Sequence, residues 1–437
     1  MIFIKKKVIK SWAKEYHGDY VLYLPKNIDE IKSIISNTKE IIPSGGNRSY
    51  GDSAISNNII NSENFNEIIS FDENKGVLKA GSGITINEIL NYLVPKGWFL
   101  NVTPGTKFAT LGGCVASDVH GKEHHKFGCF SENLISFKII LNENDILEVN
   151  KNNYPDLYKA TCGGMGLTGF IIEVELKCKK IKSSIIDYNK KLNYSLDEVF
   201  SCFEKYDSSN YSVAWLNTSI NSKDYKSIFI YGNFSNSGDF EIKKKKNIRL
   251  PFKIKMINNF TIKLFNHFYF FWNYLNKKFG STDFDSFFYP LDKIKDWYKL
   301  YGKNGFIQYQ FVIPKEKAKI GIKEVLDFLN SKGCISSLAV LKLHGKNNQN
   351  YLSFPTEGYS LAMDFPTNDK IMFLLNHVDK IVDKFDGKVY LTKDSRLSKK
   401  YFEKFYPNHV EIRKVKKKYK VSNFLSNQSS RIGMNDK

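Results

Sequence analysis

Hydrophobic and polar positions along the first 180 residues alternate between the two-residue period of strands and the longer period of amphipathic helices. A helix is expected to begin after Thr85, because Thr85 and Glu88 have the spacing of a capping box. The order predicts a mixed α/β domain that ends near residue 180. Its expected elements are strands at 19–25, 40–45 and 169–177, hairpins at 68–83 and 136–150, and helices at 28–39 and 154–163.

The second half of the chain has a different pattern, with strands expected at 211–219 and 226–234. From residue 305 onward the order becomes β-α-β-β-α-β, which predicts a ferredoxin-like antiparallel sheet with its helices on one face. This second unit is expected to cap the first. The six elements are strands at 305–314, 335–345, 359–367 and 388–392 and helices at 315–332 and 369–387.

A basic and aromatic segment, residues 242–280, separates these strands. It contains Lys243 to Lys246 in a row, and further lysines alternate with phenylalanines. Such a segment can lie on an anionic membrane surface. The alternative is a solvated loop followed by an ordinary buried helix.

Composition narrows the class of protein. A chain of 437 residues with 42% hydrophobic residues can form two or three domains with real cores. The net charge of +20 favours anionic partners without choosing among phosphate substrates, anionic lipid and nucleic acid. Six irregularly spaced cysteines argue against a zinc site or a disulfide framework. The N-terminus does not resemble a signal peptide, and the apolar run 265–275 is interrupted and too short to span a bilayer, so a cytoplasmic location is expected.

Three glycine-rich loops carry the candidate chemistry: 44–54, 103–125 and 162–170. Glycines let backbone N–H groups approach a phosphate closely, so three such loops favour one extended, phosphate-bearing cofactor. Residues 164–169 formally match G-x-G-x-x-G, but they precede a strand rather than follow one. A Rossmann domain is therefore rejected.

Long motifs in these loops and in the second half of the chain resemble a known family. They include SGGNRSYGD, TPGTKFATLGGCVASDVHGKEHH, GFIQYQFVIP, VYLTKDSRL and SNQSSRIG. The chain resembles flavin-linked oxidases of the vanillyl-alcohol oxidase and p-cresol methylhydroxylase superfamily. Within it, the similarity is greatest to the decaprenylphosphoryl-β-D-ribose 2′-oxidase family, the flavin half of an epimerase.

This resemblance implies an α+β fold with a two-part FAD-binding domain of the p-cresol methylhydroxylase type under a cap domain built on the antiparallel, ferredoxin-like sheet. The N-terminal part of the FAD-binding domain is expected at 1–185 and the cap at 186–390, with the insert at 242–280. The segment 391–437 is expected to return to the FAD-binding domain.

The resemblance also implies which residues bind FAD. Contacts to the pyrophosphate and the ribityl chain are expected from the first two loops, and contacts flanking the flavin from the third. The expected cofactor-binding residues are Gly45, Gly46, Asn47, Arg48, Ser49, Tyr50, Thr106, Gly112, Gly113, Ser117, His120, Gly121, Gly166, Thr168, Gly169 and Ile172.

By the same resemblance, the catalytic residues are Lys393, Gln310 and His120, because a lysine beside the flavin can stabilise negative charge. The expected substrate contacts are Lys122, Trp215, Gln308, Lys342, Ser360, Ala362 and Asp364. The three histidines His120, His124 and His125 could suggest a metal, but no convergent carboxylate accompanies them, so no metal is predicted.

Three positions depart from the family pattern. Mycobacterial members have a cysteine and an asparagine where this chain has Ala362 and Ser360, and Val213 stands where a serine is expected. Some relatives attach FAD covalently through a histidine near the first loop. Residues 47–50 include no histidine, so non-covalent FAD is predicted.

The resulting hypothesis is FAD-dependent oxidation of the 2′-hydroxyl of a polyprenyl-phosphate pentose, with a separate NAD(P)H-dependent reductase completing an arabinan-precursor epimerisation. The protein would be cytoplasmic and peripheral at the inner face of the membrane. Two alternatives remain: a soluble sugar-alcohol or aldonolactone oxidase, and a non-catalytic basic protein that binds lipid or nucleic acid. No nucleic-acid motif is visible, so a nucleic-acid partner is not expected.

Overall fold

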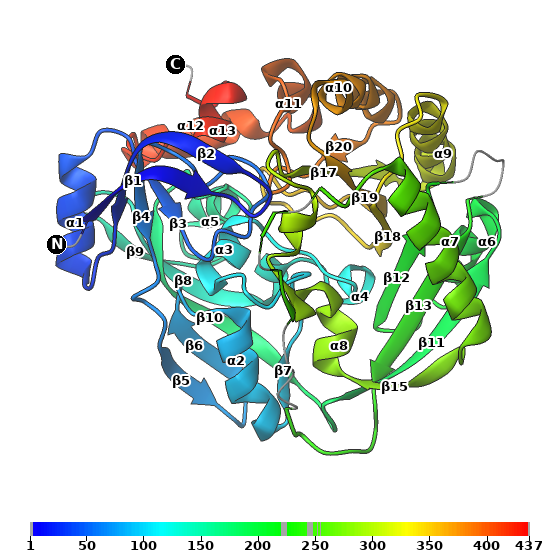
Figure 1. The fold of residues 1–437 in the computed structure, drawn as a ribbon. Coiled ribbons are helices and arrows are strands. Elements are labelled where there is room, and N and C mark those ends of the chain that lie inside the picture. The colour runs from blue at the N-terminus through cyan, green and yellow to red at the C-terminus, as the bar shows by residue number, and fades with distance from the viewer. Residues whose placement is uncertain (1–2, 220–224, 243–247, 251, 254, 436–437) are drawn as a thin grey trace.

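The computed structural model describes residues 3–219, 225–242, 248–250, 252–253 and 255–435. Two small sheets form an N-terminal lobe, and one large sheet forms the second lobe beside it (Figure 1). The chain therefore has an α+β architecture with two lobes, and the second lobe is here termed the cap.

The first sheet of the N-terminal lobe has the order β1-β2-β4-β3. Helix α1 covers it, and the spacing of buried Ile31, Ile34 and Ile35 gives the helix one apolar face. The strand β1 was not predicted, because its lysines leave it almost wholly exposed. The elements are β1 (Phe3–Lys10), β2 (Glu15–Tyr23), α1 (Ile28–Asn37), β3 (Ile42–Ser44) and β4 (Asn58–Asn61).

The second sheet has the order β5-β6-β10-β8-β9, and β7 pairs with β10. Both predicted hairpins are present as antiparallel pairs. The predicted capping box starts α2, with Glu88 N donating to Thr85 Oγ1 (3.2 Å) and Thr85 N donating to Glu88 Oε2 (2.8 Å). The elements are β5 (Ile68–Asp72), β6 (Val77–Gly81), α2 (Ile86–Leu93), β7 (Trp98–Leu100), α3 (Leu111–Ala116), α4 (His124–Phe127), β8 (Leu134–Ile140), β9 (Ile146–Val149), α5 (Pro155–Thr161) and β10 (Phe170–Lys180).

The cap contains an eight-stranded sheet of order β15-β11-β13-β12-β18-β19-β17-β20. Strands β17 to β20 and helices α9 and α10 have the predicted ferredoxin-like arrangement, and the remaining four strands extend it from the β18 edge. The last predicted strand is much shorter than expected, because only Lys388 and Val389 pair with β17. The elements are β11 (Ile185–Asn193), α6 (Leu196–Lys205), β12 (Tyr211–Leu216), β13 (Ser227–Phe234), β15 (Phe279–Asp283), α8 (Phe284–Phe288), β17 (Phe306–Pro314), α9 (Lys315–Ser331), β18 (Leu338–His344), β19 (Gly358–Pro366), α10 (Asp369–Lys384) and β20 (Lys388–Val389).

The basic and aromatic segment 242–280 contains a short strand, β14 (Ile248–Arg249), which pairs with β16 (Ile294–Lys295), and one long helix, α7 (Asn259–Leu275). Lys243 to Lys246 lie outside the described residues. Helix α7 packs against β13 (Figure 1). It is not an ordinary buried helix, because most of its aromatic residues are exposed. No helix in the described part of the chain is long and apolar enough to cross a membrane.

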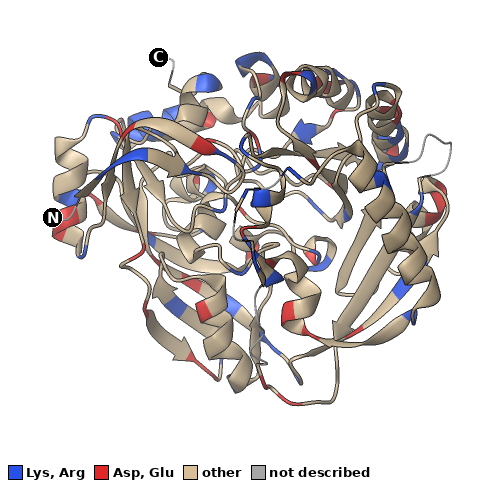
Figure 2. Cartoon of the chain, viewed as in Figure 1, with Lys and Arg blue, Asp and Glu red and all other residues tan. Residues whose placement is uncertain are grey.

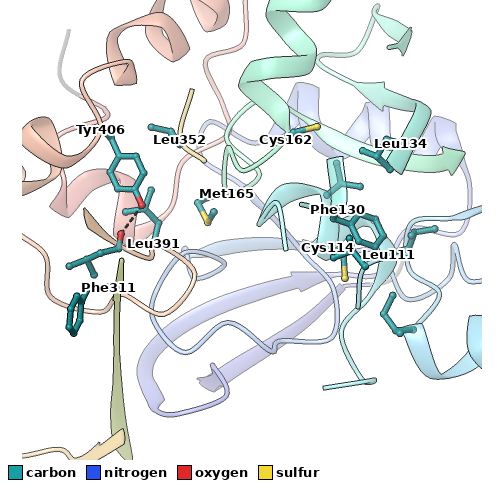
Figure 3. Packing of buried hydrophobic residues seen from close by; sticks show 14 of the residues in the cluster. Leu111, Cys114, Phe130, Leu134, Cys162, Met165, Phe311, Leu352, Leu391 and Tyr406 are labelled. Atoms are coloured by element: carbon teal, nitrogen blue, oxygen red, sulfur yellow. Dashed lines mark hydrogen bonds between the residues drawn. The ribbon is translucent and has the colours of Figure 1, made fainter. Parts of the chain in front are cut away.

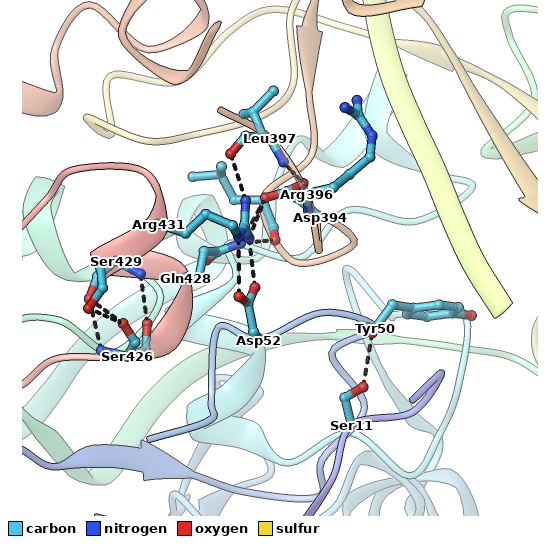
Figure 4. A network of polar contacts seen from close by, with 12 residues as sticks. Ser11, Tyr50, Asp52, Asp394, Arg396, Leu397, Ser426, Gln428, Ser429 and Arg431 are labelled. Carbon is cyan, nitrogen blue, oxygen red and sulfur yellow. Dashed lines mark hydrogen bonds and ion pairs between the residues drawn. The ribbon is translucent and has the colours of Figure 1, made fainter. Parts of the chain in front are cut away.

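The C-terminal segment returns to the N-terminal lobe through α11 (Lys399–Phe405), α12 (His409–Lys418) and α13 (Asn427–Arg431). A polar network fastens it there (Figure 4). Arg431 binds both Asp52 (2.7 Å) and Asp394 (2.9 Å), and its Nη1 donates to Leu397 O. One arginine thus joins the first glycine-rich loop, the segment after β20 and the C-terminal helix.

One continuous core runs through both lobes. Met165 of the third glycine-rich loop and Leu391, which follows β20, both belong to it (Figure 3). Tyr406 from the C-terminal segment donates a hydrogen bond to Val389 O (2.6 Å). All six cysteines are free, and four of them are buried. The glycine-rich loops and the strands of the cap are consequently held as one packed unit.

Candidate active site

A cavity of about 740 Å³ lies between the lobes, and all three glycine-rich loops line it. The opposite wall comes from β12, β13, β17, β18 and β19 of the cap, and from α7 and α8. Ligand sites of this size are typical for a cofactor or a large substrate. The sequence therefore folds so that the three predicted loops share one site.

The first two loops meet where glycine is required. A Cβ on Gly45 would lie 2.0 Å from Thr110 Oγ1, and a Cβ on Gly46 would lie 2.5 Å from Phe108 O. No larger residue fits between these loops without moving the backbone. Asn47 continues the turn with a positive φ of 51°. This close packing places the main chain of both loops directly on the cavity.

Several polar groups in this part of the cavity lack a protein partner. None of the described residues accepts a hydrogen bond from the backbone N–H groups of Gly46, Asn47 or Arg48. The buried atoms Arg48 Nε and Ser82 Oγ also have no partner there. Buried polar groups are nearly always hydrogen-bonded, so these donors suit a bound anion such as a diphosphate. The N–H of Gly112 is different, because it already donates to Ser82 O (2.8 Å).

Arg48 is held in place by aromatic rings. Its guanidinium lies 4.6 Å from the ring centroid of Trp12 and 5.3 Å from that of Phe108. Burial lowers the pKa of Arg48, while Asp292 opposes that effect. An arginine fixed in this way can neutralise phosphate charge at the cavity.

In the third loop, Gly166 has a φ of +79° and lines the cavity beside Gly169. Thr168 and Ile172 do not line the cavity. Thr168 is buried and its hydroxyl bonds to Thr161 Oγ1 (3.0 Å), so its role here is to hold the loop. Gly121 also lies outside the lining residues. It packs against Thr103 instead, since a Cβ on Gly121 would lie 2.4 Å from Thr103 O.

The remaining predicted cofactor-binding residues all line the cavity. The hydroxyl of Thr106 donates to Asp292 (3.1 Å). Thr106 would therefore contact a ligand through its other atoms. The residues that line the cavity are Gly45, Gly46, Asn47, Arg48, Ser49, Tyr50, Thr106, Gly112, Gly113, Ser117, His120, Gly166 and Gly169.

Lys393 lies where the cavity meets the first loop. Its Nζ is 3.5 Å from the centroid of the Tyr50 ring, and Tyr50 N donates to Thr392 O (3.0 Å). Burial lowers the pKa of Lys393 to about 7, with Asp364 opposing and Lys342 assisting the change. The side chain can therefore exist as a neutral amine near neutral pH.

His120 and Gln310 meet across the two lobes. Gln310 Nε2 donates to His120 Nε2 (2.9 Å), and His120 Nδ1 is buried without a partner among the described residues. Burial holds the pKa of His120 well below its usual value, and the positive charges of Lys342 and Lys393 act in the same direction. The imidazole is thus neutral and presents one free polar atom.

Two further lysines approach the same region. Lys122 donates to Phe287 O, and burial, with help from Lys342, lowers its pKa to about 7. Burial also lowers the pKa of Lys342. Together with Lys393 these side chains place three amino groups at the cap end of the cavity, and a phosphorylated ligand bound there would favour their charged forms.

Of the predicted substrate contacts, Lys122, Trp215, Gln308, Lys342 and Ala362 line the cavity. Asp364 does not, because it is fully buried behind Gln308 and accepts from its Nε2 (2.6 Å). Ser360 is likewise behind the wall, hydrogen-bonded to His344 Nε2 (2.7 Å). Asp364 thus supports Gln308, which faces the cavity, whereas Ser360 bonds to a histidine that does not line it.

Some cavity residues were not predicted from the sequence. Tyr390 packs against His120 with the two rings tilted and their centroids 4.9 Å apart, and its hydroxyl donates to Ser117 O (2.9 Å). Tyr269 of α7 packs edge-on to Trp215 (4.9 Å). Tyr390 stands three residues before Lys393, so its motif could have indicated it. Tyr269 had no such signal in the sequence.

The histidines do not converge on a metal site. His125 Nε2 bonds to Ser209 O (2.8 Å), whereas His124 Nδ1 accepts from Gly345 N (3.1 Å). No group of three or more histidine, cysteine or acidic residues in the described chain is arranged to hold a metal ion.

Comparison with known proteins agrees with this geometry. Residues 20–150 match the FAD binding domain family. The chain is 29% identical to decaprenylphosphoryl-β-D-ribose oxidase of Mycolicibacterium smegmatis over 86% of its own length and 85% of the relative. It is also 24% identical to D-arabinono-1,4-lactone oxidase of Kluyveromyces lactis over 39% of this chain and 34% of that protein. A putative mitochondrial D-lactate dehydrogenase of Schizosaccharomyces pombe is 27% identical over 40% of this chain and 36% of its own.

FAD is thus the cofactor of this site, and the residues present suit it. The donor-rich end, with Arg48 and the unpaired N–H groups, matches a diphosphate. The end near Lys393, His120 and Gln310 supplies polar atoms at which a hydroxyl could be held and oxidised.

Proposed function

Because this chain is an FAD-dependent oxidoreductase of the vanillyl-alcohol oxidase and p-cresol methylhydroxylase superfamily acting on CH–OH groups, we propose that its substrate is a polyprenyl-phosphate pentose. The 2′-hydroxyl of the sugar would be oxidised to a ketone. A separate NAD(P)H-dependent reductase would then complete an epimerisation.

The observation that carries this proposal is the pairing of lysines and aromatic residues in the cap end of the cavity. Lys122 and Lys342 bring two amino groups to it, and a phosphate bound beside them would favour their charged forms. Beside them Trp215 of β12 and Tyr269 of α7 form an aromatic wall. A sugar that carries both a phosphate and a hydrocarbon tail presents the complementary chemistry.

The reaction removes a hydride from the carbinol carbon and a proton from its hydroxyl. The chemistry that bound FAD supplies is acceptance of the hydride. Lys393 is the best candidate to receive the proton, because its pKa of about 7 leaves much of it neutral at neutral pH. His120 is a far weaker base, since burial holds its pKa well below its usual value. Its role is to orient the hydroxyl through Nδ1 while Gln310 fixes the ring.

We further propose that FAD is bound without a covalent link. Attachment through a histidine or a cysteine requires that side chain at the flavin. Among the described residues, the cavity is lined by one histidine, His120, and by no cysteine. His120 Nε2 is already bonded to Gln310. The predicted position of the protein, in the cytoplasm and peripheral at the inner face of the membrane, belongs to the same proposal.

A sugar-alcohol or aldonolactone oxidase is the second candidate, favoured by the similarity to D-arabinono-1,4-lactone oxidase. Anaerobic mixing of the FAD-loaded protein with each substrate class, while flavin absorbance is followed, separates the two. Polyprenyl-phosphoribose should bleach the flavin rapidly, and free pentoses or lactones should not. Rapid bleaching by a free lactone alone would reject the polyprenyl-phosphate substrate.

A further inference from the structure

Helix α7 has its polar and apolar faces reversed. Its buried residues are Ile262, Asn266, Phe270 and Asn273, so two of the four are asparagines. Phe268 is 63% exposed and Leu264 60% exposed on the outer side. A helix that faces water normally shows the opposite distribution. The exposed apolar residues of α7 are Phe260, Leu264, Phe265, Phe268, Phe271, Trp272, Tyr274 and Leu275.

The structure holds this orientation firmly. Asn273 Oδ1 accepts from Lys190 Nζ of β11 (3.0 Å), which ties the polar face to the cap sheet. At the start of the helix, the Asn258 side chain caps the N–H groups of Phe260 and Thr261. At its end, Lys278 Nζ donates to Tyr274 O (2.7 Å). The outward direction of the aromatic residues is therefore a fixed property of the fold.

The sequence around α7 is basic. Between Glu241 and Asp283 the sequence has no acidic residue and ten lysines and arginines. Helix α7 itself is drawn without any acidic colour in Figure 2. Exposed apolar residues also occur in the segments on either side, namely Ile248, Phe252, Met256 and Phe279. An apolar face with basic and no acidic neighbours is complementary to an anionic lipid surface.

The cavity reaches this face. Phe265 and Tyr269, one turn apart on α7, both line the cavity, and Phe265 is also 56% exposed. The site thus opens beside the apolar face. With 17 residues and a polar inner side, α7 is suited to lie along a membrane interface rather than across it.

We propose that the outer face of α7 docks on an anionic bilayer and places the mouth of the cavity at the lipid, so that a membrane-embedded substrate enters past Phe265 and Tyr269. The entry route rests on the proposed function, whereas the docking surface does not.

The test uses the FAD-loaded full chain and vesicles of phosphatidylcholine with or without phosphatidylglycerol. Leu264→Gln, Phe268→Gln and Phe271→Gln are combined in one variant. The matched control combines Ile69→Gln, Ile320→Gln and Phe373→Gln, which are exposed apolar residues on other elements. The α7 variant should lose vesicle binding by about tenfold or more, and the control should keep it. In both variants, a short-chain, water-soluble prenyl-phosphate sugar should reduce the flavin at the wild-type rate.

A second measurement does not depend on the folding of the triple variant. Brominated lipid should quench part of the tryptophan fluorescence of the wild-type chain, and the conservative single change Trp272→Phe should remove that quenching. Equal vesicle binding by the α7 variant and the control, or absence of quenching, overturns the docking surface. Equal binding to vesicles without phosphatidylglycerol overturns its dependence on anionic lipid. A wild-type dimer that dissociates in the α7 variant, with no vesicle binding, shows instead that a second copy covers this face.

These outcomes separate the two proposals. If vesicles bind through α7 but no polyprenyl-phosphate sugar reduces the flavin, the proposed function fails and the docking surface stands. If the sugar reduces the flavin while the α7 variant still binds vesicles fully, the docking surface fails and the proposed function stands.

Discussion

Lys393 Nζ lies 3.5 Å from the centroid of the Tyr50 ring, so the lysine that follows the cap sheet is seated on the first glycine-rich loop. The contact is reinforced by the hydrogen bond from Tyr50 N to Thr392 O (3.0 Å). A cation over an aromatic face is stabilised as the ammonium form. Burial acts in the opposite sense and prevails, which leaves the pKa of Lys393 at about 7. Lys393 therefore both joins the cap to the first glycine-rich loop and titrates at the active site.

We expect flavin reduction to depend on pH through Lys393. The neutral amine is present above its pKa, so the rate should rise about tenfold per pH unit below pH 7 and level off above it. Lys393→Met should lower the rate by about 100-fold or more and remove this limb. Anaerobic stopped-flow absorbance at a series of pH values measures both effects. A rate that falls as pH rises would show that the ammonium form is required instead.

Asp364→Asn provides the matching control for that pH profile. The Asp364 charge raises the pKa of Lys393, and burial raises the pKa of Asp364 itself to about 7. Removing this charge should lower the pKa of Lys393, so the rising limb should move to lower pH and survive. If the limb disappears in Asp364→Asn but persists in Lys393→Met, the carboxyl group is the group that titrates.

FAD should dissociate from the denatured chain. The described cavity offers no cysteine, and its one histidine bonds to Gln310. After acid precipitation, the yellow colour should remain in the supernatant and the intact protein mass should show no added flavin. Colour retained by the pellet, with the corresponding mass increase, would contradict the non-covalent prediction. Loss of the adduct in His120→Ala would then identify the attachment site.

Much of the fold could be predicted because local sequence determines it. The capping box at Thr85 and Glu88 and the β-α-β-β-α-β order depend on short-range pattern. The three glycine-rich loops predicted one shared ligand, because glycine lets a main chain approach another group closely, as Gly46 approaches Phe108 O. Which loops meet, however, followed from the family resemblance rather than from periodicity.

Other features depend on packing that a sequence pattern does not encode. Helix α7 was expected to be either membrane-facing or ordinary and buried, and only the structure shows that Asn266 and Asn273 face inward. Thr168 and Asp364 belong to motifs of the site, yet they act behind the cavity wall. A motif places a residue near a site, but the direction of its side chain comes from tertiary contacts.

Arg431 should be essential for the stability of the two-part FAD-binding lobe. Replacing it with methionine leaves Asp52 and Asp394 buried without their shared partner, which costs about 3 kcal/mol or more of unfolding free energy. Chemical denaturation of the FAD-loaded protein measures this loss. Arg413→Met is the control, because within the described residues Arg413 bonds only to the Gly433 carbonyl, so its replacement should cost about 1 kcal/mol.

The loss of unfolding free energy in Arg431→Met should depend on pH. Burial alone would raise the pKa of Asp394, but Arg431 and Arg396 hold it below its usual value in the folded protein. This stabilisation is present above the pKa of the unfolded carboxyl and is lost as pH falls through the folded pKa. In Arg431→Met the carboxyls can protonate more readily, so the loss relative to wild type should shrink from pH 7 to pH 4.5. A constant loss across that range would show that the arginine acts by packing alone.

The residue at position 362 should determine whether a thiol-directed reagent can label the cavity wall. It lines the cavity opposite Gln310 in the sheet register, whereas Ala339 on the neighbouring strand is equally small but does not line it. A maleimide small enough to enter the cavity should label Ala362→Cys, and peptide mass mapping should locate the adduct. Ala339→Cys should remain unlabelled, and in wild type no cavity peptide should carry a thiol adduct, because the described cavity wall holds no cysteine. Because a thiol is absent from the native wall, Ala362→Cys should leave flavin reduction within about threefold of wild type before labelling and abolish it afterwards. Labelling of Ala339→Cys at the same rate would show that reactivity reports opening of the sheet rather than access through the cavity.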